Sequence, residues 1–571
     1  VRYGKLDTMA VDSLQALPLE LDYQPEGHNE GLATYFREHL RQEVLDILEA
    51  HPKPDGTPYN LYRDGLKIFT TIDSRLQSRA EAAVAREMPD IQAQFAEDWK
   101  NREPYPERAL QRALENSPRY QALRERGWSR EKILAAFEEP TNMTVFDWRG
   151  GAVDTVLTPL DSLKHYLTLL NAGLLAVEPG TGLIKVWVGG IDHRFIQYDH
   201  VMARRQIGST MKPIVYTAAL QSGMLPCEYT PNELKSYEEF EGWTPHNSEG
   251  EYGGAYSLEG ALARSINTIA VELALRAGLE NVQNLAHEMG INGRIPKVPA
   301  IALGAVDASL WEMATVYSTF ANRGYRPNRL HYLDRIETAD GEVIIEFNRP
   351  RFADFERVLY PGHADMMLHL LQGVVDSGTA QRLRTVYGIS GPYYGKTGTT
   401  QDQRDGWFVG FNSSLVTSAW VGAENPDVHF RTLYRGQSSR TALPVAGRFL
   451  RNVYRDRQLR NWRGEPYPTP PDTVLALMQC PPYLPEMPIV EDWEGEYFEI
   501  IAWSKAIQDI PSGQLDTLLR DRPRRPNEPL GEYADRIRRV YERRERRDDR
   551  REQLKQFWVD ELFSGDKPNG G

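Results

Sequence analysis

Cysteine is scarce in this sequence, and long hydrophobic runs are missing. Only Cys227 and Cys480 occur among the 571 residues, which excludes a disulfide-rich scaffold and a cysteine-rich zinc site but says little about the redox compartment. We expect Cys227 to be an inert packing residue. No apolar run approaches the roughly 18 residues of a membrane span, and no signal peptide opens the chain. Because the first residue is Val, we expect an N-terminal part to be missing and any membrane anchor to lie there.

An excess of positive charge is also lacking. With 67 Lys and Arg against 80 Asp and Glu, the formal net charge is −13 at pH 7. No domain-wide basic surface is therefore available to neutralise phosphates, and we expect no nucleic-acid partner. The 12 histidines form no cluster at metal-ligand spacing, and His287-Glu288 lacks the second histidine of a zinc-protease helix. We predict no metal site and no cofactor.

The remaining composition is that of a globular protein, 41% hydrophobic and 26% charged, and the length suffices for roughly three or four domains. Residues 1–168 are predicted to form an interdomain linker and a helical pedestal region. Their predicted elements are an amphipathic helix over 31–49, a strand over 65–73, a helix capped by Asp73 or Ser74, and a charged, solvated helical insert over 86–140.

The central part, residues 169–455, carries the strongest strand and helix signals. A hairpin is predicted over 173–189, three further strands are predicted between 395 and 421, and helices are predicted between them. This order predicts an α+β domain whose mainly antiparallel sheet is flanked by helices. Residues 456–571 are rich in Pro and then dense in Arg, Asp and Glu, so we predict a charged extension that is helical or disordered.

The first candidate for chemistry is the motif around Ser209. Apolar residues at helical spacing follow Gly208-Ser209-Thr210-Met211-Lys212, so a helix should begin at or near Ser209 and carry Lys212 on the same face. A neighbouring amine can take the proton of a serine hydroxyl and make it a nucleophile, and the N–H groups of a helix start favour a developing oxyanion. Ser-x-x-Lys alone occurs by chance roughly once or twice in a chain of this length. Ser209 therefore needs partners.

Two further motifs supply such partners. Ser265-Ile266-Asn267 is predicted to lie in a break between two helices, where a hydroxyl and a carboxamide can face one cleft. The second motif is predicted to lie on a strand whose alternate side chains point the same way, and whose glycine lets a substrate backbone approach closely; it consists of Lys396, Thr397, Gly398 and Thr399. Each motif is weak alone. Together, in this order, the three motifs indicate serine acyl transfer.

The lysine motif also permits a phosphate-binding interpretation. Ser390 stands where the Gly-x4-Gly-Lys-Thr loop requires its first glycine, and the residues after Thr397 predict a loop and a strand instead of the required helix. Both requirements of the motif fail, so we do not adopt an NTPase. ATPase activity that depends on Lys396 would restore that hypothesis.

With their flanking residues, the motifs resemble the transpeptidase part of bifunctional, class A penicillin-binding proteins over about 30–455. The flanks that carry the resemblance are 65–77, 243–247, 377–380 and 405–410. Ile207 departs from the family, which usually has Pro there, and we expect no consequence. The glycosyltransferase domain that normally precedes this part is not found in residues 1–60, so we expect this chain not to polymerise glycan.

This resemblance implies the fold of penicillin-binding transpeptidases and serine β-lactamases, and the activity of a peptidoglycan D,D-transpeptidase. It implies Ser209 as nucleophile, Lys212 as general base, and Ser265 with Lys396 as the proton relay. The implied substrate-binding residues are Asn267, Thr397, Gly398 and Thr399, and the implied oxyanion hole is made by the N–H groups of Ser209 and Thr399. The implied partners are donor and acceptor stem peptides, β-lactam antibiotics and cell-wall synthesis proteins. The implied location is the periplasmic side of the bacterial inner membrane.

Two other functions remain open on the same residues. A D,D-carboxypeptidase or β-lactamase-type hydrolase differs only in letting water resolve the acyl-enzyme, which one sequence does not decide. A non-catalytic penicillin-binding scaffold would keep the fold without turnover, and the intact motifs argue against it. Each serine and threonine also has a purely structural interpretation, as a helix cap or an ordinary strand residue.

Overall fold

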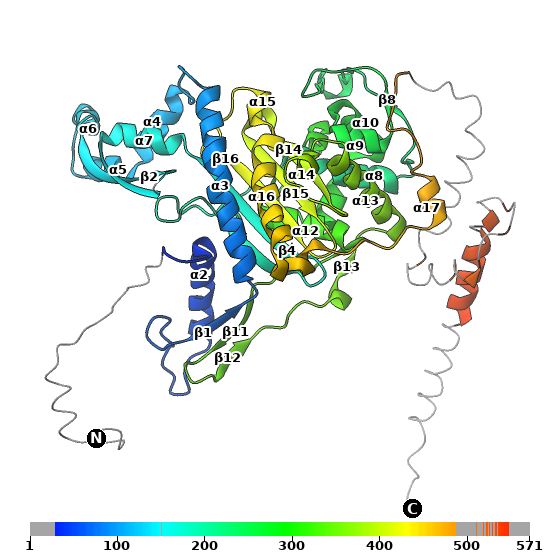
Figure 1. Cartoon of the computed structure of the whole chain (residues 1–571), viewed down its shortest axis with the longest axis horizontal. Coiled ribbons are helices and arrows are strands. Elements are labelled where there is room, and N and C mark those ends of the chain that lie inside the picture. The colour runs from blue at the N-terminus through cyan, green and yellow to red at the C-terminus, as the bar shows by residue number, and fades with distance from the viewer. Residues whose placement is uncertain are drawn as a thin grey trace, which may run out of the picture.

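The computed structural model describes residues 29–149 and 151–486, together with scattered residues between 510 and 547. Figure 1 shows a central sheet enclosed by helices, a smaller helical lobe beside it, and a small separate sheet near the N-terminal helix. Within these described ranges, none of the helices combines the length and the hydrophobicity needed to span a membrane.

Five antiparallel strands form the central sheet. In spatial order they are β14 (Tyr394–Thr399), β15 (Asp405–Phe411), β16 (Val416–Ala423), β4 (Leu170–Glu178) and β5 (Leu183–Val188). Nearly all their residues are buried because helices cover both faces, which explains why β4 and β5 are largely apolar, whereas β14 carries the polar residues of the lysine motif. The predicted hairpin over 173–189, the strands predicted between 395 and 421, and the antiparallel α+β architecture are confirmed.

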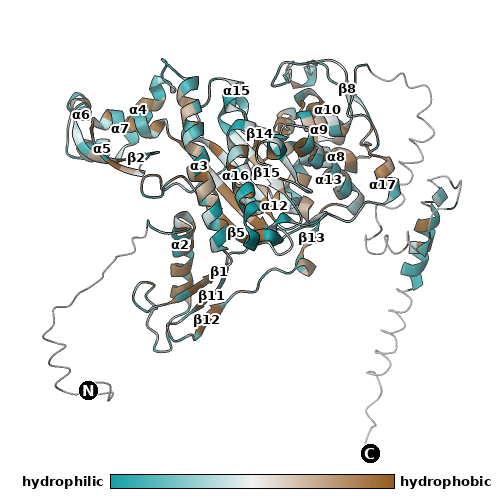
Figure 2. Ribbon diagram, in the orientation of Figure 1, coloured by the Kyte–Doolittle hydropathy of each residue, from teal (hydrophilic) through white to brown (hydrophobic). Residues whose placement is uncertain are grey.

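Different helices cover the two faces of this sheet. On one face, α12 (Leu310–Ala321) packs with its Tyr317 ring against Phe411. On the other face, the start of α16 (Ala442–Arg455) brings Thr441 against Gly406, and α3 (Ser74–Asp98) packs on α16. Gly406 and Phe411 are an odd number of residues apart on β15, so they point to opposite faces. Figure 2 shows hydrophobic colour gathered on the strands of this sheet.

The helices beside β14 bring the three predicted motifs to one edge of the sheet. The short 3₁₀ helix η1 (Gly208–Met211) leads directly into α8 (Lys212–Gln221), so the helix predicted at or near Ser209 is confirmed. A turn joins α9 (Leu258–Arg264) to α10 (Asn267–Ala277), and α13 (Pro361–Asp376) packs on α8, α9 and β14.

The part that precedes the main sheet contains more packing than its charge suggests. Its first elements are α2 (Thr34–Ala50) and β1 (Lys67–Thr70), and β1 pairs with β11 (Leu333–Glu337), which pairs with β12 (Val343–Glu346). The predicted cap of α3 is confirmed, since the Asp73 carboxylate accepts the N–H groups of Arg75 and Leu76.

A helical lobe follows α3, and its elements are α4 (Glu107–Asn116), α5 (Pro118–Glu125), α6 (Arg130–Phe137), the hairpin of β2 (Thr141–Asp147) and β3 (Gly151–Leu157), and α7 (Pro159–Leu167). The helices predicted over 86–140 are present. The lobe is more than a solvated insert, because it encloses a small core of its own around Leu114, Tyr120, Ile133 and Phe137.

Beyond residue 455 the chain continues to pack on the main domain through η7 (Arg457–Arg463), α17 (Asp472–Ala476) and β17 (Tyr483–Leu484). β17 pairs with β8 (Ala255–Tyr256), which pairs with β7 (Thr230–Pro231). Of the predicted charged extension, residues 535–547 are helical and hydrophilic in colour (Figure 2), while most of 487–571 lies outside the described residues.

A disulfide bond joins Cys227 to Cys480, so the expectation that Cys227 is an inert packing residue is wrong. The two cysteines are 253 residues apart in sequence. Such a separation gives no sign of proximity, because only the folded path of residues 456–486 brings Cys480 back to the start of the 227–257 loop.

Candidate active site

The Ser209 motif lies against the end of strand β14. The backbone N–H groups of Ile207 and Gly208 donate to the carbonyls of Val306 and Gly304 (3.0 and 3.3 Å). Gly208 has φ 53°, and a Cβ at this position would lie 2.8 Å from the Thr399 carbonyl oxygen. Glycine is required here because of both the left-handed conformation and the close approach. This approach places Ser209 beside the predicted lysine strand.

Ser209 itself is half-buried, and its hydroxyl has no hydrogen-bond partner among the described residues. The first backbone hydrogen bond of η1 runs from Thr210 N to Ile207 O. The N–H of Ser209 therefore comes before the hydrogen-bonded part of the helix, as expected of a group that can donate to a bound oxyanion.

Lys212 and the Ser265–Asn267 turn are in direct contact. Lys212 Nζ lies within hydrogen-bonding distance of the carbonyl oxygen of Ser265, of its Oγ (3.2 Å) and of Asn267 Oδ1 (2.7 Å). Ser265 adopts a left-handed backbone with φ 58° and ψ 39°, which turns the chain sharply between α9 and α10. The break between two helices that the sequence predicts is thus present, with the hydroxyl and the carboxamide on the same side.

The third motif completes the cluster from β14. Lys396 Nζ donates to Ser265 Oγ at 2.9 Å and to the Thr397 carbonyl at 2.9 Å. The Ser265 hydroxyl therefore lies between two lysine amines that come from different elements. Of the predicted site residues, Lys212, Ser265, Asn267 and Lys396 form one hydrogen-bonded group, and Ser209 and Thr399 lie beside it through the contact of Gly208 with β14.

Burial lowers the pKa of both lysine side chains. Lys212 and Lys396 are each 0% exposed, and neither forms an ion pair within the described part of the chain. Burial lowers the pKa of Lys396 to about 7. Burial, and then the charge of Lys396, lower the pKa of Lys212 well below its usual value. Because desolvation disfavours the ammonium form, a neutral amine that can accept a proton is available at physiological pH.

The threonines of the lysine strand have partners that the sequence analysis did not assign. Thr397 Oγ1 shares a hydrogen bond with Thr379 Oγ1 (2.5 Å). Thr399 Oγ1 accepts the N–H of Ser438 (2.9 Å) and lies 3.1 Å from its hydroxyl. The segment 377–380 carried part of the family resemblance, which was a usable signal for Thr379. Nothing in the sequence marked Ser438, a buried serine in a short 3₁₀ turn.

Gly398 owes its identity to the protein's own chain. We predicted that this glycine leaves room for a substrate backbone. A Cβ at residue 398 would instead lie 2.7 Å from the Ile207 carbonyl oxygen and 3.1 Å from Thr210 N. The glycine therefore allows the Ser209 helix to pack directly on β14. After β14 the chain forms only the three-residue turn η5 (Gln401–Gln403) and then β15, so the helix of a phosphate-binding loop does not follow it.

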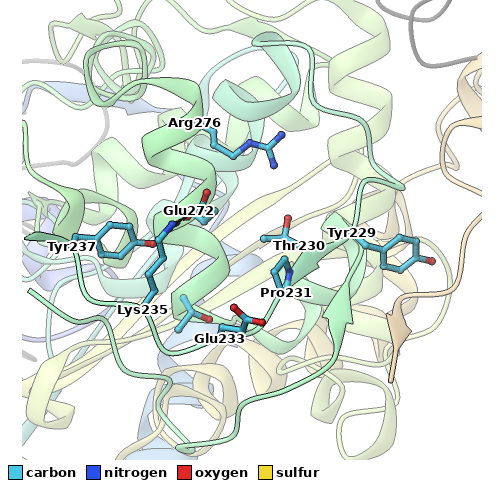
Figure 3. A pocket seen from close by; sticks show the side chains of 9 residues that line it. Tyr229, Thr230, Pro231, Glu233, Lys235, Tyr237, Glu272 and Arg276 are labelled. Atoms are coloured by element: carbon cyan, nitrogen blue, oxygen red, sulfur yellow. Dashed lines mark hydrogen bonds and ion pairs between the residues drawn. The ribbon is translucent and has the colours of Figure 1, made fainter. Parts of the chain in front are cut away.

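A hollow of about 180 Å³ lies beside α10 (Figure 3). Its lining includes Thr268, Glu272 and Arg276 of α10 and the segment 229–237, with Lys235 paired to Glu272 at 3.3 Å. None of the eight predicted site residues lines it. Elsewhere in the described chain, no group of three or more His, Cys, Asp or Glu side chains is placed to hold a metal ion.

The fold and the site together define a class. A serine at a helix start, two buried lysines and a second serine beside an antiparallel sheet are the parts of the penicillin-interacting serine enzymes. Residues 173–455 match the family model "Penicillin binding protein transpeptidase domain", and residues 95–170 match "Penicillin-binding protein middle domain". Residues 173–455 are therefore a penicillin-binding protein transpeptidase domain.

Curated relatives agree with this assignment. The chain is 27% identical over 486 residues to penicillin-binding protein 1A of Rickettsia bellii, which covers 74% of this chain and 58% of that protein. It is 33% identical over 299 residues to penicillin-binding protein 1A of Neisseria meningitidis, covering 51% of this chain and 36% of that protein. The chain thus spans less than two thirds of the length of the curated relatives it matches.

Solved structures share the fold. Penicillin-binding protein 1A from Haemophilus influenzae superposes with a TM-score of 0.58 at 19% identity, over 82% of this chain and 76% of that one. The PonA1 protein from Mycobacterium tuberculosis, solved in complex with penicillin V, gives a TM-score of 0.52 at 19% identity, over 77% of this chain and 97% of that one.

Proposed function

We propose that this chain is a peptidoglycan D,D-transpeptidase that cross-links stem peptides through an acyl-enzyme on Ser209 and is acylated by β-lactams. The observation that carries the proposal is the Ser265 hydroxyl held between Lys212 and Lys396, with the Ser209 turn packed on the same strand β14 through Gly208. The transpeptidase family of residues 173–455 supports it.

In the first half-reaction, Ser209 Oγ attacks the penultimate D-Ala carbonyl of the donor peptide while neutral Lys212 takes its proton. The N–H groups of Ser209 and Thr399 stabilise the oxyanion, a contribution of roughly 3 kcal/mol per donor. The C–N bond then breaks. Ser265 and Lys396 pass a proton to the departing amine, so terminal D-Ala leaves and the peptide stays on Ser209 as an ester.

The remaining site residues hold the donor peptide. The Asn267 carboxamide binds its backbone amide. The hydroxyls of Thr397 and Thr399, with the Lys396 charge, bind its terminal carboxylate, and Gly398 lets the strand that carries them reach the Ser209 helix. In the second half-reaction an amine of the acceptor peptide attacks the ester, forms the cross-linking amide and returns the proton to Ser209.

The disulfide supports a location outside the cytoplasm. A bond between Cys227 and Cys480 persists in an oxidising compartment such as the bacterial periplasm. We therefore place the domain on the periplasmic side of the inner membrane, where its substrates, and cell-wall synthesis proteins as further partners, would meet it.

Intact mass after incubation with penicillin G tests the nucleophile. We expect a gain of one whole penicillin molecule, because opening the lactam ring expels nothing, and no gain in Ser209→Ala. A chain that stays unlabelled while folded would refute the proposal in favour of a non-catalytic scaffold. A D-Ala-D-Ala peptide given with an amine acceptor then separates transfer, which yields the amide, from a carboxypeptidase, which yields only free acid. Rapid turnover of penicillin would indicate a β-lactamase.

A further inference from the structure

The turn that carries Ser265 is not favoured by its own residues. The left-handed conformation of Ser265 (φ 58°) costs an L-residue roughly 1–2 kcal/mol. The next residue, Ile266, is the N-cap of α10 and makes no side-chain cap, since it has no acceptor. The first N–H groups of α10 therefore need acceptors from elsewhere.

Asn247, in the loop between β7 and β8, supplies those acceptors. Its Oδ1 accepts the N–H groups of Asn267 (2.9 Å) and Thr268 (3.2 Å). Its Nδ2 donates to Asn232 Oδ1 (2.7 Å) and to the Glu251 carbonyl (2.8 Å). The four hydrogen bonds fix which way the amide faces, with the oxygen toward the helix and the nitrogen toward its own loop. Asn247 thus caps α10 from a distant segment of the chain.

The neighbouring residue orients the side chain of Asn267. The His246 carbonyl accepts Asn267 Nδ2 (2.8 Å), which leaves Asn267 Oδ1 to face Lys212 Nζ (2.7 Å). Each of the three hydrogen-bond acceptors of Lys212 described above belongs to Ser265 or Asn267. A movement of this turn would therefore disturb the amine that is proposed to activate Ser209.

The loop that carries Asn247 is itself anchored. Asn232 directly follows β7 and exchanges backbone hydrogen bonds with Gly253 and Gly254 (2.7 and 2.9 Å) just before β8. It also accepts the Thr268 hydroxyl (2.9 Å). β8 in turn pairs with β17, near the disulfide-bonded Cys480. Hydrogen bonds between Asn232 and the residues before β8 therefore hold Asn247 in position.

We propose that Asn247 is a positioning residue of the active site, which holds the Ser265 hydroxyl and the Asn267 carboxamide against Lys212 by capping α10. Asn247 contacts no reacting atom, so its effect passes through the turn. Only the acylation-rate measurement that tests this proposal depends on the proposed function. The cap itself is a property of the free protein.

Asn412 offers a matched control. Its Oδ1 accepts two backbone N–H groups, from Ser414 and Leu415 (2.8 and 2.9 Å), and its Nδ2 donates to Tyr454 Oη and the Trp462 carbonyl (3.1 and 3.0 Å). Like Asn247, it accepts two backbone N–H groups through Oδ1 and donates two hydrogen bonds through Nδ2, one of them to a backbone carbonyl. It follows β15 at the end of the sheet opposite Thr399, so its loss should affect stability without affecting the site.

The experiment compares Asn247→Ala with Asn412→Ala in the full chain. At saturating penicillin G, we expect Asn247→Ala to slow acylation of Ser209 roughly 10- to 100-fold, the scale of a small misplacement, with little change in penicillin affinity. Asn412→Ala should stay within roughly twofold of the wild-type rate even where it lowers Tm more. Without penicillin, hydrogen exchange of a peptide covering 262–270 should speed up in Asn247→Ala and not in Asn412→Ala.

If the Asn247→Ala variant folds and shows the same acylation rate and the same exchange of 262–270 as the wild type, the proposal is overturned. If that variant does not fold, Asn232→Ala replaces it, because it leaves both N–H bonds to Asn247 and removes the group that orients its amide. Because Asn232 also accepts the Thr268 hydroxyl, Thr268→Val, which removes only that bond, is measured beside it. Faster exchange of 262–270 in Asn232→Ala than in Thr268→Val supports the proposal, and equal exchange in the two variants overturns it. If the wild-type chain takes up no penicillin, the proposed function fails, and the exchange measurement still decides the cap.

Discussion

Replacing Lys396 by methionine should make the protein more stable while it abolishes acylation. Lys396 is fully buried and donates to Ser265 Oγ and the Thr397 carbonyl, with no carboxylate to balance its charge in the described chain. Methionine fills a similar volume without a charge, so Lys396→Met removes the cost of burying the ammonium. An active site that needs a strained charge distribution is commonly stabilised by losing it.

The size of the effect follows from the pKa. Burial lowers the pKa of Lys396 from 10.5 to about 7, and each pKa unit corresponds to about 1.4 kcal/mol. The charge therefore costs at most about 4 to 5 kcal/mol at and below pH 7. The loss of the two hydrogen bonds destabilises the variant by about 1 kcal/mol each and offsets part of this gain. A net gain of about 2 to 3 kcal/mol remains, which should raise Tm by roughly 2 to 5 °C for a unit of this size.

The sign of the pH dependence is fixed by the same shift. Between about pH 7 and 10.5 the unfolded chain keeps the proton that the folded chain has released, so wild-type stability rises with pH across this window. The Tm advantage of Lys396→Met should therefore be full at pH 6 and should shrink steadily toward pH 10. Calorimetry at pH 6, 8 and 9.5 measures it.

Lys235→Met is the control for this series, because Lys235 is exposed and paired with Glu272; it should show no such pH-dependent gap. The reasoning is refuted if Lys396→Met melts at or below wild type at pH 6. It is equally refuted if the Tm difference is the same at every pH.

Three further outcomes are expected. The second-order rate constant for penicillin acylation reports the free enzyme. It should fall above about pH 7, because Lys396 then loses the charge proposed to bind the penicillin carboxylate. A β-lactam ester without that carboxylate should show no such fall, and a fall shared by both compounds would contradict the carboxylate-binding role of Lys396. Replacing Cys227 and Cys480 together by alanine opens a loop of 253 residues, for which chain entropy gives an upper limit of about 5 kcal/mol. Dithiothreitol should lower the wild-type Tm toward that of the double variant and leave the variant unchanged, whereas equal Tm values in all four samples would show that the bond contributes nothing. Gly208→Ala puts a Cβ 2.8 Å from the Thr399 carbonyl at φ 53°, so acylation should slow roughly tenfold or more; a wild-type rate would show that η1 and β14 can separate freely.

Local sequence signals were enough to predict the parts of the fold that depend on nearest neighbours along the chain. The hairpin over 173–189, the Asp73 cap and the helix start at Ser209 each follow from residues within a few positions of one another. The residue types of the site were also visible, since Ser265, Asn267 and Lys396 were named from their motifs and meet in the structure.

Long-range partners gave no such signal. Ser438 lies 39 residues from Thr399, and Asn247 lies 20 residues from Asn267, yet both hold motif residues in place. Asn247 lies in a segment that resembles the family, but only the folded structure shows that its amide caps a helix. A second reason for Gly398 was also hidden, because a Cβ at this position would meet residues 207–210, which are distant in sequence.

The Cys227–Cys480 bond closes a covalent ring that contains Ser265, Asn267 and Lys396, while Ser209 and Lys212 lie just before it. A protease that cuts one peptide bond inside this ring leaves both fragments tethered, so the cut protein would run as one band until a reductant is added. Because Ser209 and Lys212 stay on the fragment that carries Cys227, a molecule clipped in this way keeps all three active-site segments covalently linked after the polypeptide itself is broken.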